Sequence, residues 1–316
     1  MSITLFRHTD CERHDMGEMH PESPERIRSI DELLSAAKLN ELICYVQAPL
    51  AEPEQLKQAH TVDYIDYLVA QDRWLAECAE QGEQSPSVQL DPDTVLMRHS
   101  FTAALRAAGA AIAAVDEVID GTNRRAFCAV RPPGHHALKD RAMGFCILGN
   151  AAIAAYHALN IKGLKRVAII DFDVHHGNGT ENIVEGDERI RLFSSYQSNF
   201  YPFPDMAAAK PNVLHTPLAA GSESEEFRSA VSRWFPAVDA FAPELIIISA
   251  GFDAHIEDPL AQLRLHEADY NWITTELVTL ANRHAQGRIV SLLEGGYNLN
   301  ALGRSVVSHI RALIQN

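Results

Sequence analysis

Cysteine is scarce in this sequence of 316 residues, and its five cysteines stand apart with no CxxC pair among them. A dispersed, odd-numbered set is typical of reduced thiols, and it argues against a disulfide framework or a zinc site built from cysteine. The N-terminal segment is polar after one short apolar patch and does not resemble a secretory signal. Together these features predict a cytoplasmic protein.

Basic residues and long apolar runs are also few. Lysine and arginine number 27 against 42 aspartates and glutamates, which gives a formal net charge of -15 and a pI of about 5.4. Nucleic-acid binding requires clustered lysine and arginine, so this balance argues against a nucleic-acid partner. No apolar run approaches the roughly 18 residues that a spanning helix needs, which argues against a membrane partner.

No internal repeat, low-complexity tract or linker divides the chain, and 47% of its residues are hydrophobic, enough for a sizeable core. Runs rich in Val, Ile, Leu and Phe predict strands at Ile3–Phe6, Ala126–Val130, Val167–Phe172, Ile190–Phe193, Leu245–Ser249 and Ile289–Leu293. Helices are predicted at Pro24–Lys38, Arg98–Asp120, Asn150–Asn160, Ser224–Phe241, His266–Ala285 and Ala301–Ile314. This alternation predicts one α/β domain over residues 1–316, with an open parallel sheet flanked by helices.

Polar motifs directly follow four of the predicted strands. They are RPPGHHA at residues 131–137, DFDVHHGNGT at 171–180, AGFDAHIEDP at 250–259 and EGGYNL at 294–299. Ligands of open parallel sheets bind beyond the carboxyl ends of the strands. His, Asp and Tyr that follow four strand ends, with Gly beside them, therefore predict one site on a rigid scaffold.

The second of these motifs predicts a metal site. Asp173 and His175 are two residues apart in an extended segment, so their side chains should point to the same side, with Asp171 one step deeper. Buried charge at a strand end is costly unless a cation offsets it. With Asp253 as the third ligand, two carboxylates and one imidazole suit zinc and leave a position open for water.

Two further motifs supply groups for acid–base chemistry. The tandem His135-His136 follows two prolines and a glycine, which stiffen the turn and permit close backbone approach. Imidazoles held beside a metal can activate a bound water, because histidine titrates near working pH. Tyr297 stands beside paired glycines and predicts a phenol that donates to a developing oxyanion.

These motifs, together with HPESPERI at residues 20–27 and GFCILGN at 144–150, resemble in their order the histone deacetylase superfamily with its arginase/deacetylase fold. The likeness runs from His20 to Tyr297 and is strongest to bacterial histone deacetylase-like amidohydrolases and acetylpolyamine amidohydrolases. It implies a zinc-dependent amidohydrolase that removes acetyl or other acyl groups from acyl-lysine or a related amine and releases acetate.

The resemblance also implies roles for single residues. The zinc ligands, one ion per chain, are Asp173, His175 and Asp253; the base and later acid is His136, with His135 as its electrostatic companion, and the oxyanion donor is Tyr297. A structural potassium ion is implied at Asp171 and Ser194. The acyl-lysine channel is implied at Gly144, Phe145, Phe203 and Leu260, the substrate-binding rim at Asp91 or Asp93, and an acetate exit route at Arg26.

Three other functions stay open at this point. An acetylpolyamine deacetylase is the first of them, since Glu257 and the loop from Asp10 to His20 offer anionic contacts to a polyamine. Leu260, however, resembles protein deacetylases rather than the acidic gatekeeper of polyamine-specific relatives. A binuclear manganese ureohydrolase needs additional carboxylates beside the metal ligands, and a silent acyl-lysine-binding module is opposed by the complete catalytic set. A homo-oligomer is also left open.

Overall fold

The structure is a computed structural model that describes residues 2–203 and 210–315. Eight strands form one sheet in the order β2-β1-β5-β10-β9-β6-β7-β8, and every neighbouring pair in it is parallel. Their bounds are β1 Ile3–Arg7, β2 Ile43–Gln47, β5 Arg125–Cys128, β6 Val167–Asp171, β7 Ile190–Gln197, β8 Val213–Leu218, β9 Leu245–Ala250 and β10 Ile289–Leu293. The predicted fold class is therefore confirmed.

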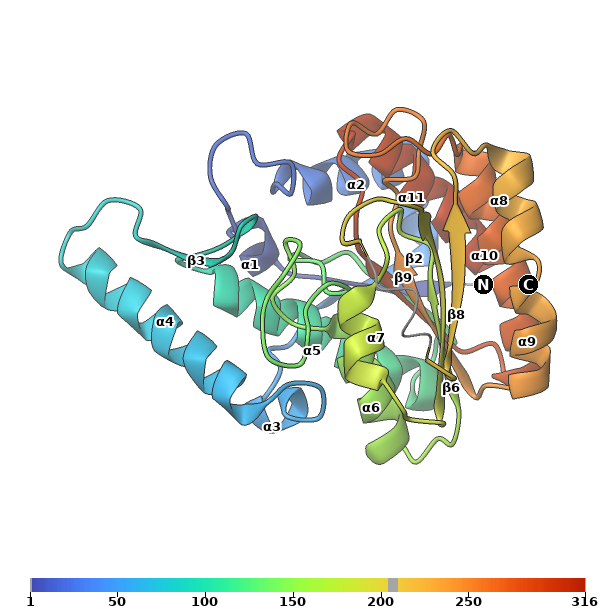
Figure 1. Ribbon diagram of the computed structural model, residues 1–316, viewed down its shortest axis with the longest axis horizontal. Helices are drawn as coiled ribbons and strands as arrows, with labels where there is room; N and C mark the ends of the chain where they lie inside the picture. Colours follow the sequence, from blue (N-terminus) through green and yellow to red (C-terminus); the bar gives the residue numbers. More distant parts are fainter. Residues whose placement is uncertain (1, 204–209, 316) are drawn as a thin grey trace.

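Helices cover both faces of this sheet, as Figure 1 shows with the sheet seen nearly edge-on. On one face lie α5 (Ser100–Asp120), α6 (Asn150–Asn160) and α7 (Asn178–Val184), with α3 (Pro53–Leu56) and α4 (Val62–Glu80) outside them. The other face carries α2 (Glu25–Ala36), α8 (Ser224–Val231), α9 (Trp234–Phe241), α10 (Glu267–His284) and α11 (Leu299–Ile314). The short α1 (Thr9–Glu12), the 3-10 turn η1 (Asn40–Leu42) and a small hairpin of β3 (Ser87–Asp91) and β4 (Thr94–Met97) complete the described chain.

The central strand β6 shows why the sheet is hydrophobic throughout rather than alternating. Val167 and Ile169 pack into the core on the α5 and α6 side, whereas Ala168 and Ile170 pack into the core on the opposite side. All four side chains are fully buried. A parallel sheet covered on both faces requires apolar residues at successive positions, so the run that predicted this strand also fixes its place in the middle.

One predicted helix is wrong in detail. The segment Ser224–Phe241 forms two helices that meet at Ser232 and Arg233 instead of one. Pro236 has no N–H to donate and its ring clashes with the preceding turn, so it is tolerated in a first helical turn but not in an interior. The second helix begins at Trp234, which places Pro236 in its first turn and buries the Trp234 ring.

The prediction missed the two edge strands β2 and β8, the β3–β4 hairpin and the helices α4 and α7. Strand β8 contains Pro217, and proline in a sheet is confined to edge positions such as this one because it cannot donate to a ladder. Residues of β2 are largely exposed. Weak or interrupted apolar patterns therefore mark the two edge strands of the sheet. The six predicted strands are the six that lie between these edges.

No helix within residues 2–203 and 210–315 is both long enough and apolar enough to cross a membrane. The four motif-bearing loops follow β5, β10, β9 and β6, which are consecutive neighbours at the centre of the sheet. Because the strands are parallel, the four loops leave the sheet at one edge. The topology thus gathers segments that are up to about half the chain apart.

The buried His309 predicts a loss of stability in acid. Its ring on α11 is bonded to the hydroxyls of Thr274 at 2.7 Å and Ser291 at 2.8 Å, and burial lowers its pKa to about 3. The unfolded chain takes up this proton near pH 6.5, so stability should fall as the pH drops below that value. Between pH 7 and pH 5, His309 should contribute a loss of about 2 kcal/mol in unfolding free energy.

Urea unfolding of the parent and of His309→Gln at both pH values measures this contribution. Each protein is compared with itself at pH 7, so a pH-independent cost of the substitution cancels. The acid-induced loss should be smaller in the variant, and equal losses in both proteins would contradict the account.

Candidate metal centre and active site

Three potential ligands meet where the loops after β6 and β9 leave the sheet. The ligand atoms of Asp173, His175 and Asp253 all lie within 4.8 Å of one another. Nδ1 of His175 is 3.1 Å from Oδ1 of Asp173 and 3.2 Å from Oδ2 of Asp253. The structure therefore brings together the three residues that the sequence predicts as zinc ligands.

The surroundings of these ligands fit a bound divalent cation. Oδ2 of Asp253 is buried and has no hydrogen-bond partner in the described part of the chain. The second oxygens are used: Oδ1 of Asp253 accepts from the N–H of Val174 at 3.0 Å, and Oδ2 of Asp173 accepts from the N–H of Gly295 at 2.8 Å. Each carboxylate is thus held by the backbone while one oxygen faces the His175 ring, as a two-carboxylate, one-imidazole site requires.

The tandem histidines differ in their partners. Nδ1 of His135 donates to Oδ2 of Asp171 at 3.0 Å, and Nδ1 of His136 donates to Oδ1 of Asn178 at 2.7 Å. An amide oxygen can only accept, so this bond keeps the His136 proton on Nδ1 and leaves Nε2 as a lone pair. The two rings lie 4.0 Å apart, and the His136 ring borders the pocket described below.

The same environment separates the pKa values of the two rings. Burial lowers the pKa of His135, but the charges of Asp173 and Asp171 outweigh burial and raise it well above its ordinary value. Burial and the neighbouring rings of His135 and His175 hold the pKa of His136 well below its ordinary value. A cationic His135 therefore lies beside a neutral His136, and a pair so divided can assign acid and base roles.

Glu294 fixes the turn that carries these histidines. Its Oε2 accepts the N–H groups of Gly134 at 2.7 Å and of His135 at 3.1 Å, and its Oε1 accepts the hydroxyl of Ser249 at 3.0 Å. Burial raises its pKa to about 7. The motif EGGYNL contains this residue, but the sequence prediction assigned it no role; an acid at the end of a buried strand, next to paired glycines, was the available sign.

Tyr297 is held over the site by its backbone and by Arg26. Its N–H donates to Oδ2 of Asp258 at 2.7 Å, and the Arg26 guanidinium lies 5.1 Å from its ring centroid. Burial raises the pKa of Tyr297 well above its ordinary value, so the phenol keeps its proton. Arg26 itself is buried, bonded to Glu22 at 2.9 Å and to the carbonyl oxygens of Gly296 and Glu294.

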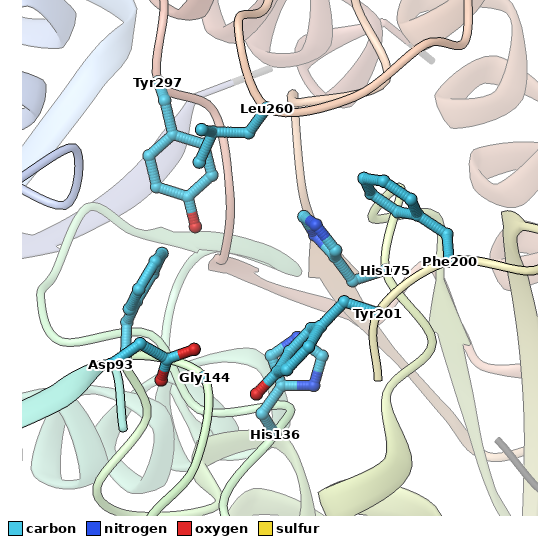
Figure 2. A pocket seen from close by; sticks show the side chains of 9 residues that line it. Asp93, His136, Gly144, His175, Phe200, Tyr201, Leu260 and Tyr297 are labelled. Atoms are coloured by element: carbon cyan, nitrogen blue, oxygen red, sulfur yellow. The ribbon is translucent and has the colours of Figure 1, made fainter. Parts of the chain in front are cut away.

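A cavity of about 200 Å³ opens onto these groups. It is lined by Asp93, His136, Gly144, Phe145, His175, Phe200, Tyr201, Leu260 and Tyr297. Figure 2 shows the Tyr297 hydroxyl directed into this space, with His175 and His136 on the side away from Tyr297. A potential metal ligand, a neutral imidazole and a protonated phenol thus border one small, largely apolar pocket.

Gly144, Phe145 and Leu260 lie in the pocket wall, as the sequence predicts, but Phe203 does not. Phe203 is 72% exposed, and the phenylalanine and tyrosine residues that line the pocket are Phe145, Phe200, Tyr201 and Tyr297. The Phe200 ring stacks on His175 with centroids 5.4 Å apart. The segment NFYPFP contains several aromatic residues, and order in sequence alone did not identify which of them face the cavity.

The two candidate rim aspartates differ in position. Asp93 lines the pocket, whereas Asp91 is not among the lining residues and accepts the Asp93 N–H at 2.9 Å. Thr94 ties this turn to the channel by accepting the N–H of Phe145 at 2.9 Å. Burial and the adjacent Asp91 raise the pKa of Asp93 to about 6. Above that pH, Asp93 places a negative charge at the pocket.

Asp171 and Ser194 are neighbours in the pairing of β6 with β7. The Ser194 hydroxyl is buried without a hydrogen-bond partner among the described residues, and Asp171 is fully buried. A buried carboxylate and an unmatched hydroxyl are groups that could contribute to a monovalent-cation site. The structure brings the two residues together as the sequence predicts.

Fold and site define the class of the protein: a parallel α/β protein with two carboxylates and one imidazole that could hold a cation. These potential ligands lie in the central loops beside a phenol and a tandem histidine pair. Residues 20–313 match the family described as the histone deacetylase domain. The chain belongs to the histone deacetylase family.

Similar proteins agree with this assignment. The chain is 36% identical to the histone deacetylase-like amidohydrolase of Pseudomonas aeruginosa, over 88% of this chain and 73% of that protein. It is 33% identical to Type-2 histone deacetylase 2 of Dictyostelium discoideum over its whole length, which spans only 21% of that protein. The crystal structure of the HDA15 HD domain matches with a TM-score of 0.90 and 31% identity, over 99% of this chain and 90% of that one. The family indicates a deacetylase or amidohydrolase, a hydrolase that acts on amides.

Gly295 tests the packing around the ligands. A Cβ at this position would lie 2.0 Å from Oδ2 of Asp253 and 2.6 Å from Oδ2 of Asp173. Gly295→Ala should displace both carboxylates and weaken zinc binding by about 10- to 100-fold, the usual cost of disturbing groups that orient metal ligands.

Competition with a chromophoric chelator measures this affinity. Gly163→Ala is the control: nothing lies within 4 Å of its added Cβ, although its positive φ lowers stability by about 1 kcal/mol. Parent-like zinc affinity in Gly295→Ala would contradict the geometry.

Proposed function

We propose that this protein is a zinc-dependent deacetylase that hydrolyses the amide of an acylated amine, with acyl-lysine as the favoured substrate. The observation that carries the proposal is the convergence of the Asp173, His175 and Asp253 ligand set, the His136 ring and the Tyr297 hydroxyl on one pocket. A hydrolase needs an activated water, a base and an oxyanion donor within reach of one carbonyl carbon. These groups are present in one place.

The metal ligands would be Nδ1 of His175 and one oxygen each of Asp173 and Asp253. A zinc ion bound there would supply a Lewis acid for the acyl carbonyl and lower the pKa of a water. The chain holds its own side of the site rigidly, since both carboxylates accept backbone N–H groups. One ion is expected at this site.

His136 would take the proton from the attacking water. Its Nδ1 proton is fixed by Asn178, so Nε2 carries the accepting lone pair, and the low pKa of this ring keeps that lone pair free at neutral pH. The neighbouring His135 cation, paired with Asp171, would favour return of the proton to the amine nitrogen as the C–N bond breaks. Water adds to the amide, and the products are a carboxylate and a protonated amine.

Tyr297 would donate its phenolic hydrogen to the carbonyl oxygen as negative charge develops there. Its high pKa keeps the proton available, and the Asp258 and Arg26 contacts hold the ring in position before the substrate arrives. Because a donor aligned in advance needs no reorganisation during the reaction, its hydrogen bond contributes strongly to stabilising the transition state. Arg26, buried beneath this ring, stays a candidate for the acetate exit route.

A structural potassium ion at Asp171 and Ser194 is part of the proposal. The unmatched Ser194 hydroxyl and the buried Asp171 carboxylate support it. A cation there would hold the end of β6 against β7, and with it the loop that carries His175.

The sequence-based expectations of a cytoplasmic location and of no nucleic-acid or membrane partner rest on composition alone.

The shape of the pocket supports an acyl-lysine substrate. A narrow cavity of about 200 Å³ with Phe145, Phe200 and Leu260 in its wall suits an extended alkyl chain better than a bulky group. Asp93 supplies one carboxylate at the pocket, and Glu257 is paired with Arg304 at 2.7 Å. Acetylpolyamine hydrolysis is the second candidate, because Asp15, Glu18 and Glu25 line an adjoining hollow that reaches Tyr297.

A binuclear manganese ureohydrolase and a silent binding module find less support. A binuclear centre needs further free carboxylates near the first ion, but Asp171 accepts from His135 and from the N–H of Asp173, and Glu294 accepts from three donors. A module that only binds acyl-lysine does not require a neutral histidine and a phenol at the same pocket.

Tyr297→Phe tests the oxyanion role. Removal of one preorganised donor should lower kcat by about 10²-fold or more on an acetyl-lysine peptide. Zinc content should not change, because Tyr297 is not a ligand. Tyr45→Phe is the control, since its exposed hydroxyl bonds only to Asn40 in the described structure. Turnover of Tyr297→Phe equal to that of the parent would refute the assignment.

A substrate comparison tests the choice between amines. We expect kcat/KM to be higher for acetyl-lysine peptides than for acetylputrescine or acetylspermidine, and Asp93→Asn to lower peptide kcat/KM by about 10-fold, the loss of one hydrogen bond to a charged group. Glu257→Gln is the control and should have little effect. A preference for acetylpolyamines would favour the second candidate.

Chelation of the metal should abolish all activities, and added zinc should restore them.

A further inference from the structure

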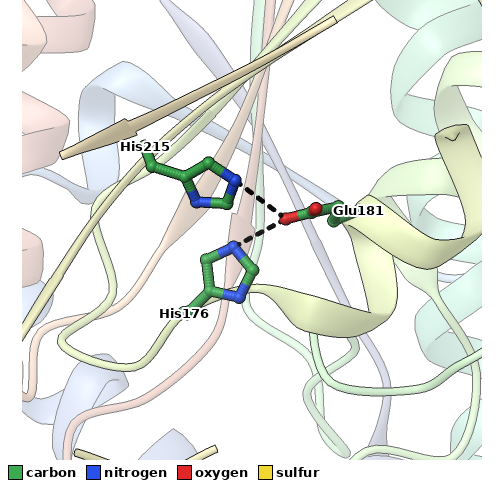
Figure 3. A group of neighbouring side chains, drawn as sticks. All are labelled: His176, Glu181 and His215. Carbon is green, nitrogen blue, oxygen red and sulfur yellow. Dashed lines mark ion pairs between the residues drawn. The ribbon is translucent and has the colours of Figure 1, made fainter. Parts of the chain in front are cut away.

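A second group of potential ligands stands beside the active-site loop. His176 lies in the loop after β6, Glu181 in α7 and His215 in β8, and their ligand atoms all lie within 4.8 Å of one another. Figure 3 shows both imidazoles directed at the Glu181 carboxylate. Nε2 of His176 is 2.9 Å and Nε2 of His215 is 3.4 Å from the same oxygen, Oε2.

This group is separate from the catalytic ligands even though His175 and His176 are consecutive. The His175 ring contacts His136, Phe200 and Tyr201 at the pocket. The His176 ring instead contacts Tyr196 and His215, on the two strands at the β8 edge of the sheet. The two consecutive rings therefore lie on different sides of the loop.

His176 has unmet polar atoms. Its residue is only 2% exposed, yet neither ring nitrogen makes a hydrogen bond with any described residue, and neither does Oε2 of Glu181. The 2.9 Å contact between the two side chains is therefore close but not aligned as a hydrogen bond. Buried nitrogen and carboxylate atoms without partners are costly and uncommon. An ion placed between their lone pairs removes that cost.

His215 is oriented for the same purpose. Its Nδ1 lies 3.4 Å from the Tyr196 hydroxyl, which leaves Nε2 facing Glu181. Metal-binding histidines commonly have the second ring nitrogen held by a polar neighbour, because this bond sets the ring orientation. The side chains of His215 and Glu181 are 10% and 15% exposed, so an ion from solvent can reach the cluster.

We propose that His176, Glu181 and His215 form a second binding site, apart from the catalytic one, for a divalent ion of the zinc class. Two imidazoles and one carboxylate are a borderline donor set that suits zinc and other late first-row ions and leaves a fourth position for water. The ion would join the loop after β6, helix α7 and the edge strand β8. Because α7 also carries Asn178, which holds His136, the ion would stabilise the helix on which the proposed base depends.

Zinc stoichiometry of the whole enzyme tests this site. The protein is equilibrated with excess zinc chloride, freed of unbound metal by gel filtration, and analysed by mass spectrometry of the metal. The parent should hold two ions per chain, and His215→Asn and Glu181→Gln should each hold one. His284→Asn is the control, a histidine paired with the single carboxylate of Asp239, and it should hold two.

Asp253→Asn separates this site from a binuclear centre and from the proposed function. It should lose only the catalytic ion, together with activity, and keep the second. A zinc content in both His215→Asn and Glu181→Gln equal to that of the parent, whether one ion or two, would overturn the proposal. Loss of both ions in Asp253→Asn would overturn it as well, since the two would then share one centre. The number of zinc ions that His215→Asn loses relative to the parent does not depend on whether the parent has deacetylase activity. A failure of the proposed function is therefore distinguishable from a failure of the second site.

Discussion

Buried negative charge at the carboxyl edge of the sheet is the constraint on which the rest of the structure depends. Asp171, Asp173, Asp253 and Glu294 lie fully buried, or nearly so, at the ends of three adjacent strands. Carboxylates this close and this dry resist ionising together, so burial and the neighbouring Asp173 raise the pKa of Asp253 to about 7. Backbone N–H groups, the His135 cation and a divalent ion are the groups that can offset this charge. The loops after β5, β6, β9 and β10 are shaped to deliver them.

The same constraint explains the glycines and the second layer of contacts. A side chain at Gly144 would clash with the His136 ring, because the nearest ring atom would lie 2.4 Å from its Cβ. Only glycine lets this part of the pocket wall approach the ring so closely. Glu294 and Asn178 hold the two histidines from opposite directions, one through the backbone and one through Nδ1. Rigid support of this kind keeps the neutral His136 ring at the pocket and the cationic His135 ring beside it.

Much of this arrangement is predictable from the sequence because the inner strands carry unbroken apolar runs and their ends carry charged motifs. The six predicted strands and the meeting of Asp173, His175 and Asp253 follow from that pattern. Edge strands such as β8, which contains Pro217, have no comparable pattern and were missed. Helix α4 was missed although Tyr64, Ile65 and Leu68 are buried at helical spacing. Hydrogen bonds between residues far apart in the chain are also not predictable from the sequence. Asn178 and Glu294 contact the two histidines only after folding brings them together. Sequence order within a loop also does not show which side chains face a cavity. Phe203 was predicted in the pocket wall, but the nearby Phe200 and Tyr201 line the pocket instead.

The central claim is that one zinc ion joins the loops after β6 and β9. A crystal structure of the zinc-loaded protein, with anomalous diffraction collected on both sides of the zinc absorption edge, tests it most directly. The account predicts a full anomalous peak within about 2.0–2.2 Å of Nδ1 of His175 and of one oxygen each of Asp173 and Asp253. Zinc-saturated crystals with no peak between these three side chains, or with their ligand atoms turned apart, would contradict it.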